Sequence, residues 1–381
     1  MSILKNVRAY IPTLGIVRTD IEYADGVITS VKENTDHTPS SLPEDAIVLP
    51  GFIDQHVHGA GGYDAMDQSP AAIGAISQTL AGEGTTAFLA TTMTQSEEAL
   101  TRALSAIRDA KNGNYDTGAE LLGVHLEGPF ISPKYIGAQP KEYIQEPRYE
   151  QFRAYRDASG DLIRIVSLAP EVTGAGELIS ALTREGIAVS AGHSAAGYED
   201  MKRAIAAGLR AVTHTYNAQS PVHHREIGVV GAAMLCDELY TELICDTIHV
   251  SIPAIQLLLR SKPAEKVILI TDAMRAKSLS DGVSELGGQT VYVQNGEARL
   301  SDGTLAGSVL RMNEAIRNLV TRVGVPIERA VDYATINPAR HLGVADRMGS
   351  IEVGKAASFA ILDGEFNVLE TIVCGKTVFK K

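Results

Sequence analysis

The chain has 381 residues, 45% of them hydrophobic, and carries a formal net charge of −12. This length exceeds the usual domain size of about 100 to 200 residues, so we expect one large domain with a smaller companion. The acidic balance argues against a nucleic-acid or anionic-membrane partner, although local cations and backbone N–H groups can still bind a phosphorylated small molecule.

Cysteine usage and hydropathy indicate a reducing, aqueous compartment. Cys236, Cys245 and Cys374 are odd in number and widely spaced, which is unlike a disulfide framework. No stretch of about 18 apolar residues occurs, and Arg8 and Pro12 interrupt the apolar start of the chain. We therefore expect a soluble cytoplasmic protein.

Both ends of the chain contain short strand-like segments rich in apolar and β-branched residues and bounded by Gly, Asp or Asn. These segments are residues 3–10, 26–33, 358–363 and 369–380. Neither end is large enough to form a core alone. We therefore predict that residues 1–50 and 346–381 pair into one small β-sandwich domain, which brings the termini together.

The region between the two ends repeats one pattern eight times. A short apolar run ends in a polar residue and is followed by apolar residues at helical spacing, often with Gly near the helix end. The runs are residues 46–58, 85–92, 121–129, 163–171, 187–193, 211–217, 243–249 and 267–273. Eight such units predict an α/β fold, a (β/α)₈ barrel over residues 51–345, with active-site groups at the C-terminal ends of its strands. A strand-rich insert follows the eighth run at residues 290–300, with a turn at Asn295-Gly296.

Seven polar residues fall where these predicted strands end. They are His56, His58, Glu127, His193, His214, His249 and Asp272. Each one alone has an ordinary explanation, as a solvated or hydrogen-bonded side chain. Seven at equivalent positions favour a single site at one rim of the barrel. His56 and His58 alternate along a strand, so they face the same side with Cα atoms roughly 6.5 Å apart.

Imidazole and carboxylate side chains are suitable ligands for a divalent ion. An ion held by Glu127, His193 and His214 would keep one coordination position open for water, as catalytic sites do. Asp272, at the last strand, could accept a proton from that water and return it to a leaving amine. Sequence does not distinguish among Zn²⁺, Fe²⁺, Mn²⁺ and Co²⁺.

Longer motifs carry a family resemblance. The segments "PGFIDQHVHG" and "GSIEVGKAASFAILD" resemble the amidohydrolase superfamily, whose members join a metal-bearing barrel to a small β-sandwich. Within it, "HLEGPF", "SAGHS", "THTYNA", "HHREIG", "DTIHV", "ITDAM" and "LAGS" are similar in order and spacing to the N-acetylglucosamine-6-phosphate deacetylases, over essentially the whole chain. The resemblance implies hydrolysis of the acetamide of N-acetylglucosamine 6-phosphate to glucosamine 6-phosphate and acetate, in amino-sugar catabolism.

Carried over residue by residue, the resemblance makes Glu127, His193 and His214 the ligands of the hydrolytic metal and Asp272 the catalytic base and acid. It implies contacts to the sugar phosphate from Ala138, Gln139, Asn217, Ala218, Arg225, His249, Leu305, Ala306 and Gly307. Arg225 is expected to reach its phosphate across the interface of a homodimer.

Two features depart from the pattern of other family members. Some members lack the pair His56 and His58, so this chain holds either one ion or two, the second bridged by Glu127. Gln139 stands where other members carry His, so it can donate a hydrogen bond but cannot carry charge.

Other functions remain open at this stage. The same chemistry on N-acetylgalactosamine 6-phosphate differs by one hydroxyl orientation, and no residue decides between the two sugars. A cyclic-amide hydrolase of the same superfamily often uses a carboxylated Lys between its metals, and Glu127 counts against it. A barrel that serves only as a binding scaffold is disfavoured because every ligand type is retained.

Overall fold

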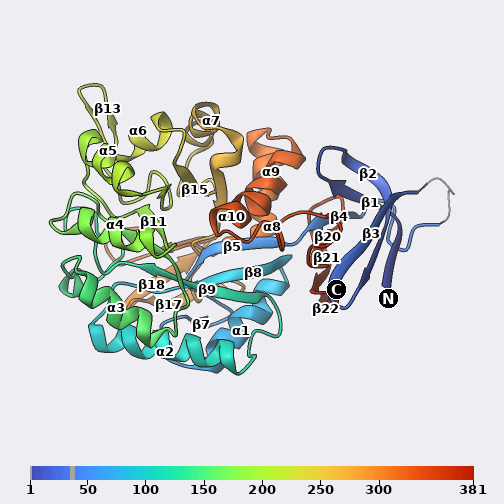
Figure 1. Cartoon of the computed structure of the whole chain (residues 1–381), viewed down its shortest axis with the longest axis horizontal. Coiled ribbons are helices and arrows are strands. Elements are labelled where there is room, and N and C mark those ends of the chain that lie inside the picture. The colour runs from blue at the N-terminus through green and yellow to red at the C-terminus, as the bar shows by residue number, and fades with distance from the viewer. Residues whose placement is uncertain (1, 35–38) are drawn as a thin grey trace.

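A computed structural model describes residues 2–34 and 39–381. Residue 1 and residues 35–38, which fall in the predicted small domain, lie outside this description. Eight parallel strands form a barrel with helices around it, and a second sheet containing both termini lies to one side (Figure 1). The predicted (β/α)₈ fold with a terminal β-domain is therefore confirmed.

The barrel strands match the eight predicted runs. They are β5 (Phe52–Val57), β8 (Thr85–Thr91), β9 (Glu120–Glu127), β10 (Ile163–Leu168), β11 (Ala188–Ala191), β12 (Ala211–Val212), β15 (Tyr240–Ile244) and β16 (Val267–Ile270). Nearly all of their residues are buried, as expected for parallel strands covered on both faces. β5 and β16 close the barrel, where the N–H of Asp272 donates to the carbonyl of His56 at 2.9 Å and Val57 bridges Ala273.

Helices alternate with these strands and cover the outside of the barrel (Figure 1). They are α1 (Pro70–Ala81), α2 (Glu97–Asn112), α3 (Tyr149–Ala158), α4 (Ala175–Arg184), α5 (Tyr198–Ala207), α6 (Val229–Leu235), α7 (Ile252–Ser261) and α8 (Met312–Asn318), followed by α9 (Ile327–Ala334) and α10 (Ile336–His341). α2 shows why such segments are helical: the Ser96 side chain accepts from the N–H of Ala99, and Glu97 and Glu98 occupy its first turn. No helix in the described residues is both long and apolar enough to cross a bilayer.

The sheet at the termini is continuous but curled. Its strands lie in the order β22-β21-β20-β4-β1-β2-β3. They span β1 (Ser2–Ile11), β2 (Gly15–Ala24), β3 (Val27–Glu33), β4 (Ile47–Pro50), β20 (Phe359–Leu362), β21 (Val368–Val373) and β22 (Lys376–Lys380). The rings of Tyr23 on β2 and Phe359 on β20 are 5.7 Å apart, although β1 and β4 separate those strands in the sheet. The sheet therefore folds over its own apolar core, like a sandwich.

The strand β2 was not predicted from the sequence, because only the segments before and after it, residues 3–10 and 26–33, were recognised as strand-like. β4 runs directly into the barrel strand β5, with Gly51 between them. We propose that the domain boundaries lie where the sequence placed them, at residues 50/51 and 345/346.

The predicted insert is a small antiparallel sheet of β17 (Gly282–Leu286), β18 (Gln289–Gln294) and β19 (Glu297–Arg299). Its predicted turn is confirmed, because Asn295 and Gly296 both have positive φ, 52° and 81°, as a two-residue hairpin turn requires. The Gln289 side chain donates to the carbonyl of Ala138 at 2.7 Å. The insert is thus attached to the loop that follows Glu127.

Candidate active site

Three site residues adopt a backbone conformation that is rare outside glycine. His193, His214 and Asp272 have φ of 49°, 30° and 49°, and each lies two residues beyond the end of a barrel strand. A non-glycine residue held in such a conformation costs on the order of 1–3 kcal/mol and persists only where its surroundings impose it. The same unusual turn at three strand ends brings these side chains into one cavity at the C-terminal rim.

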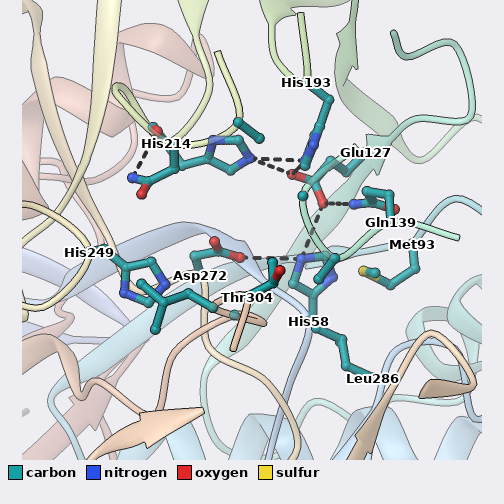
Figure 2. A pocket seen from close by; sticks show the side chains of 16 residues that line it. His58, Met93, Glu127, Gln139, His193, His214, His249, Asp272, Leu286 and Thr304 are labelled. Atoms are coloured by element: carbon teal, nitrogen blue, oxygen red, sulfur yellow. Dashed lines mark hydrogen bonds and ion pairs between the residues drawn. The ribbon is translucent and has the colours of Figure 1, made fainter. Parts of the chain in front are cut away.

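The first donor group consists of Glu127, His193 and His214. Glu127 Oε1 lies 3.3 Å from His193 Nε2 and 3.1 Å from His214 Nε2, and the two nitrogens are 3.1 Å apart (Figure 2). His193 Nδ1 lies 3.1 Å from the carbonyl of Tyr135 and donates to it, which leaves a lone pair on Nε2. Ligands bound tetrahedrally at 2.0–2.1 Å are about 3.3 Å apart, so these three atoms fit one cation.

The second donor group consists of His56, His58 and Asp272. Asp272 Oδ1 lies 3.4 Å from His56 Nε2 and 3.3 Å from His58 Nε2. Glu127 belongs to this group too, with Oε1 3.3 Å from His56 Nε2 and Oε2 3.3 Å from His58 Nε2. The fully buried His56 Nε2 has no hydrogen-bond partner among the described residues. A buried lone pair beside two carboxylates is the arrangement that a second cation would satisfy.

The charges in the site favour a positive species at its centre. Burial alone would lower the pKa of His58, but the carboxylates of Asp272 and Glu127 outweigh it and raise that pKa to about 9. Burial would likewise raise the pKa of Asp272, but the neighbouring imidazoles, His56 first, lower it to about 2. The carboxylates therefore stay ionised. Protons bind the imidazole nitrogens through the same lone pairs that a metal ion would use, so protons and metal ions compete for them.

A cavity of about 200 Å³ opens onto these groups. Most residues predicted to contact substrate line it: Ala138, Gln139, Asn217, Ala218, His249, Leu305 and Gly307. Ala306 does not, because it is fully buried in the apolar cluster behind the cavity. Arg225 does not either, because it lies in an exposed hairpin formed by β13 (Val222–His223) and β14 (Glu226–Ile227).

Gln139 contacts one of the proposed metal ligands, Glu127, directly. Its Nε2 donates to Glu127 Oε2 at 2.7 Å (Figure 2). Its Oε1 accepts from the N–H of Thr94 at 2.7 Å. Only 4% of Gln139 is exposed. In this structure Gln139 therefore holds the Glu127 carboxylate in place.

His249 reaches the cavity differently from the other predicted residues. The seventh strand, β15, ends at Ile244, so His249 lies on the loop five residues beyond it. Asp246 holds this loop: its Oδ1 accepts the N–H groups of Ile248 and His249 at 2.8 Å, and its Oδ2 lies 2.6 Å from His249 Nδ1. The other ring nitrogen of His249, Nε2, is then available to hydrogen-bond a ligand in the cavity, which His249 lines.

Sequence reasoning missed several residues around the site. Met93, Leu286 and Thr304 line the cavity (Figure 2), and nothing in their sequence context marks them. His125 and Glu242 are buried beneath the donor groups. His125 precedes Glu127 by two residues on a strand, the same alternation that singled out His56 and His58, so that signal was available.

Comparisons with known proteins give one consistent result. Residues 47–378 match the amidohydrolase family. The chain is 45% identical to N-acetylglucosamine-6-phosphate deacetylase of Bacillus subtilis (strain 168), over 93% of this chain and 91% of that protein. It is 37% identical to N-acetylgalactosamine-6-phosphate deacetylase of Escherichia coli O157:H7, over 93% of both chains. A crystal structure of N-acetylglucosamine-6-phosphate deacetylase from Thermotoga maritima, 34% identical, superimposes over the full length of both chains with a TM-score of 0.91.

Proposed function

Because the chain belongs to the amidohydrolase family, we infer that it is a metal-dependent hydrolase that deacetylates N-acetylglucosamine 6-phosphate. The products are glucosamine 6-phosphate and acetate, and the reaction belongs to amino-sugar metabolism. The observation that carries this function is the convergence of Glu127, His193, His214 and Asp272 in one cavity of a chain that is 45% identical to a deacetylase of that substrate.

Two ions per chain are our proposal, one held by Glu127, His193 and His214 and the other by His56, His58 and Asp272, with Glu127 shared. The proximity of the two donor groups supports this count. When bound, a divalent ion lowers the pKa of water toward neutrality and polarises a carbonyl oxygen. Its identity among zinc, iron, manganese and cobalt is to be measured by metal analysis of the purified protein.

Asp272 transfers the proton in this proposal. Its carboxylate lines the cavity and is ionised, so it can accept a proton as water attacks the acetamide carbonyl. It then returns that proton to the nitrogen as the carbon–nitrogen bond breaks and acetate forms. Gln139 keeps Glu127 oriented throughout.

Binding of the substrate phosphate is favoured by a cation near the cavity. No lysine or arginine is among the described residues that line the cavity. Arg225, exposed on its hairpin, is available to a neighbouring chain, and a guanidinium binds phosphate through two parallel hydrogen bonds. We therefore propose a homodimer in which Arg225 completes the partner's site. An Arg225→Ala variant with an unchanged KM, or full activity of a dilute monomer, would contradict it.

Acetate release from N-acetylglucosamine 6-phosphate tests the function. Asp272→Asn should lower kcat by roughly 10²–10⁴-fold, the usual contribution of acid–base catalysis. Asp237→Asn, the same change at an exposed position, serves as the matched control and should leave the rate unchanged. Parental acetate release by metal-loaded Asp272→Asn would show that Asp272 does not carry the proton.

N-acetylgalactosamine 6-phosphate is the second candidate substrate, favoured by the relative from Escherichia coli O157:H7 that is 37% identical. Comparing kcat/KM on the two sugars decides between them. The cyclic-amide alternative loses support because the shared ligand is Glu127 and no lysine is found among the described cavity residues. A silent scaffold would bind no stoichiometric ion, so metal analysis tests that alternative. The cytoplasmic location stays a prediction.

A further inference from the structure

Glu242 is a buried carboxylate outside both proposed sets of metal ligands. It lies within β15, only 1% exposed, on the side of the donor groups away from the cavity. The proposed hydrolysis gives it no role. A buried charge is costly unless its surroundings satisfy it, so the groups around Glu242 indicate what it does.

Three donors converge on the two oxygens of Glu242. Oε2 lies 3.0 Å from His56 Nδ1 and accepts the backbone N–H of His214 at 3.1 Å. Oε1 accepts from Gln55 Nε2 at 2.6 Å. Glu242 thus contacts one residue of each donor group, His56 through its ring and His214 through its backbone.

The contact with His56 sets the state of that imidazole. A carboxylate has no proton to donate, so Nδ1 of His56 must carry the hydrogen and donate it to Glu242. The lone pair is then left on Nε2, which points at Glu127 and Asp272. A carboxylate behind a histidine ligand orients the ring and raises its basicity toward a metal.

We propose that Glu242 is a positioning residue that fixes the tautomer and orientation of His56 for the second ion. The inference rests on the proposed metal-dependent function. The bond from Glu242 to the N–H of His214 ties the same carboxylate to the left-handed turn that carries a ligand of the first ion.

An amide at this position would not satisfy the same donors. Glutamine offers one oxygen, so its NH₂ group would face either Gln55 or the donors from His56 and His214. Reversing the Gln55 amide to match it would turn an NH₂ group toward His341 Nδ1, which lies 3.0 Å from Gln55 Oε1, so that ring would have to change tautomer. The carboxylate at position 242 satisfies Gln55 and His56 without such a rearrangement.

Glu242→Gln tests the proposal through ion binding. The metal-free protein is titrated with Zn²⁺ against a competing chelator dye, and circular dichroism monitors its fold. We expect the parental chain to bind two ions and the variant to bind one of them about 10–100-fold more weakly, the usual effect of losing such a partner. Glu238→Gln, the same change at an exposed residue near the start of the same strand, should bind both ions as the parent does.

The outcomes are distinguishable. A folded Glu242→Gln protein that binds both ions with parental affinity overturns the positioning role while leaving the metal-dependent function intact. A parental protein that binds no ion overturns the proposed function itself. If Glu242→Gln does not fold, Glu242→Asp decides: it keeps the charge but shortens the side chain by one methylene, which withdraws the carboxylate from His56 Nδ1 and should weaken binding of the same ion. Unchanged affinities of folded Glu242→Asp for both ions would refute the inference.

Discussion

Replacing Lys277 by Met should destabilise the protein, and the loss should depend strongly on pH. Lys277 is fully buried, with Nζ 2.8 Å from Glu83 Oε2. Glu83 is 1% exposed and also accepts the backbone N–H of Met312 at 2.9 Å. Methionine fills a similar volume without the charge, so the variant leaves Glu83 as a buried carboxylate without its cation.

The loss follows from leaving Glu83 unpaired. Burial raises the pKa of Glu83 above its ordinary 4.5, and Lys277 opposes that rise, so the rise is unopposed in the variant. Breaking a buried ion pair from one side typically costs about 3–5 kcal/mol, which is the loss expected at pH 7.

The sign of the pH dependence is fixed. A carboxyl whose folded pKa lies above its unfolded pKa binds more protons in the folded state, so the stability of the variant falls as pH rises above 4.5. Because the rise in the pKa of Glu83 is larger in the variant than in the parent, the destabilisation should be smaller at pH 5 than at pH 7. Urea unfolding at pH 7 and pH 5, with chelator in every sample, measures both values.

An exposed lysine provides the matched control. Lys380 Nζ lies 3.2 Å from Glu370 Oε2, but the lysine side chain is 69% exposed. Lys380→Met should therefore change stability by less than about 1 kcal/mol at either pH. A loss below about 1 kcal/mol for Lys277→Met at pH 7, or an equal loss at both pH values, would refute the reasoning.

Three further predictions concern the close approach of Gly51 to Thr86, the buried His125 and the metal. Gly51→Ala should lower the free energy of unfolding in urea by about 1–3 kcal/mol, because the new Cβ would lie 2.6 Å from Thr86 Cβ. Gly176→Ala, with open space around the new Cβ, is the control and should not destabilise the protein. Equal effects of the two substitutions would contradict this prediction. Burial, reinforced by His56, lowers the pKa of His125 from 6.5 to about 3, so the unfolded chain binds the extra proton and stability falls as pH falls from 6.5 toward 3. His125→Asn should reduce the slope of unfolding free energy against pH, measured in metal-free protein, by up to about 1.4 kcal/mol per unit, and an unchanged slope would be inconsistent with a neutral buried ring. Dialysis against a chelator should lower Tm, and divalent ion at 100 times its Kd should restore about 2.7 kcal/mol of unfolding free energy. A Tm that changes under neither treatment would argue against bound metal.

The barrel could be predicted from sequence because each of its strands is a local pattern that sequence displays directly. A buried apolar run followed by an amphipathic helix is recognisable by itself, and eight of them leave few architectures. The convergence of the donor residues was predictable for the same reason, because parallel strands place their ends at a common rim; these residues are His56, His58, Glu127, His193, His214 and Asp272.

The rest of the site could not be read in this way. Glu242 looks like any charged residue in a short strand, and its importance comes from donors on β5 and beyond β12, far away in sequence. The hydrogen bond from Gln139 to Glu127 depends on the path of a loop that no periodicity describes. Arg225 carries a family motif, yet its place on an exposed hairpin follows only from the folded chain.

The order of strands in the terminal sheet has a consequence for protein synthesis. β4 lies between β1 and β20, and β20 begins more than three hundred residues after β1 ends. While the ribosome translates the barrel, β4 therefore has one edge open, and its partner has not yet been made. A chain released before residue 359 would keep that edge exposed, since unpaired strand edges recruit other strands. Premature termination should thus yield aggregates, even for a fragment that includes every residue of the active site.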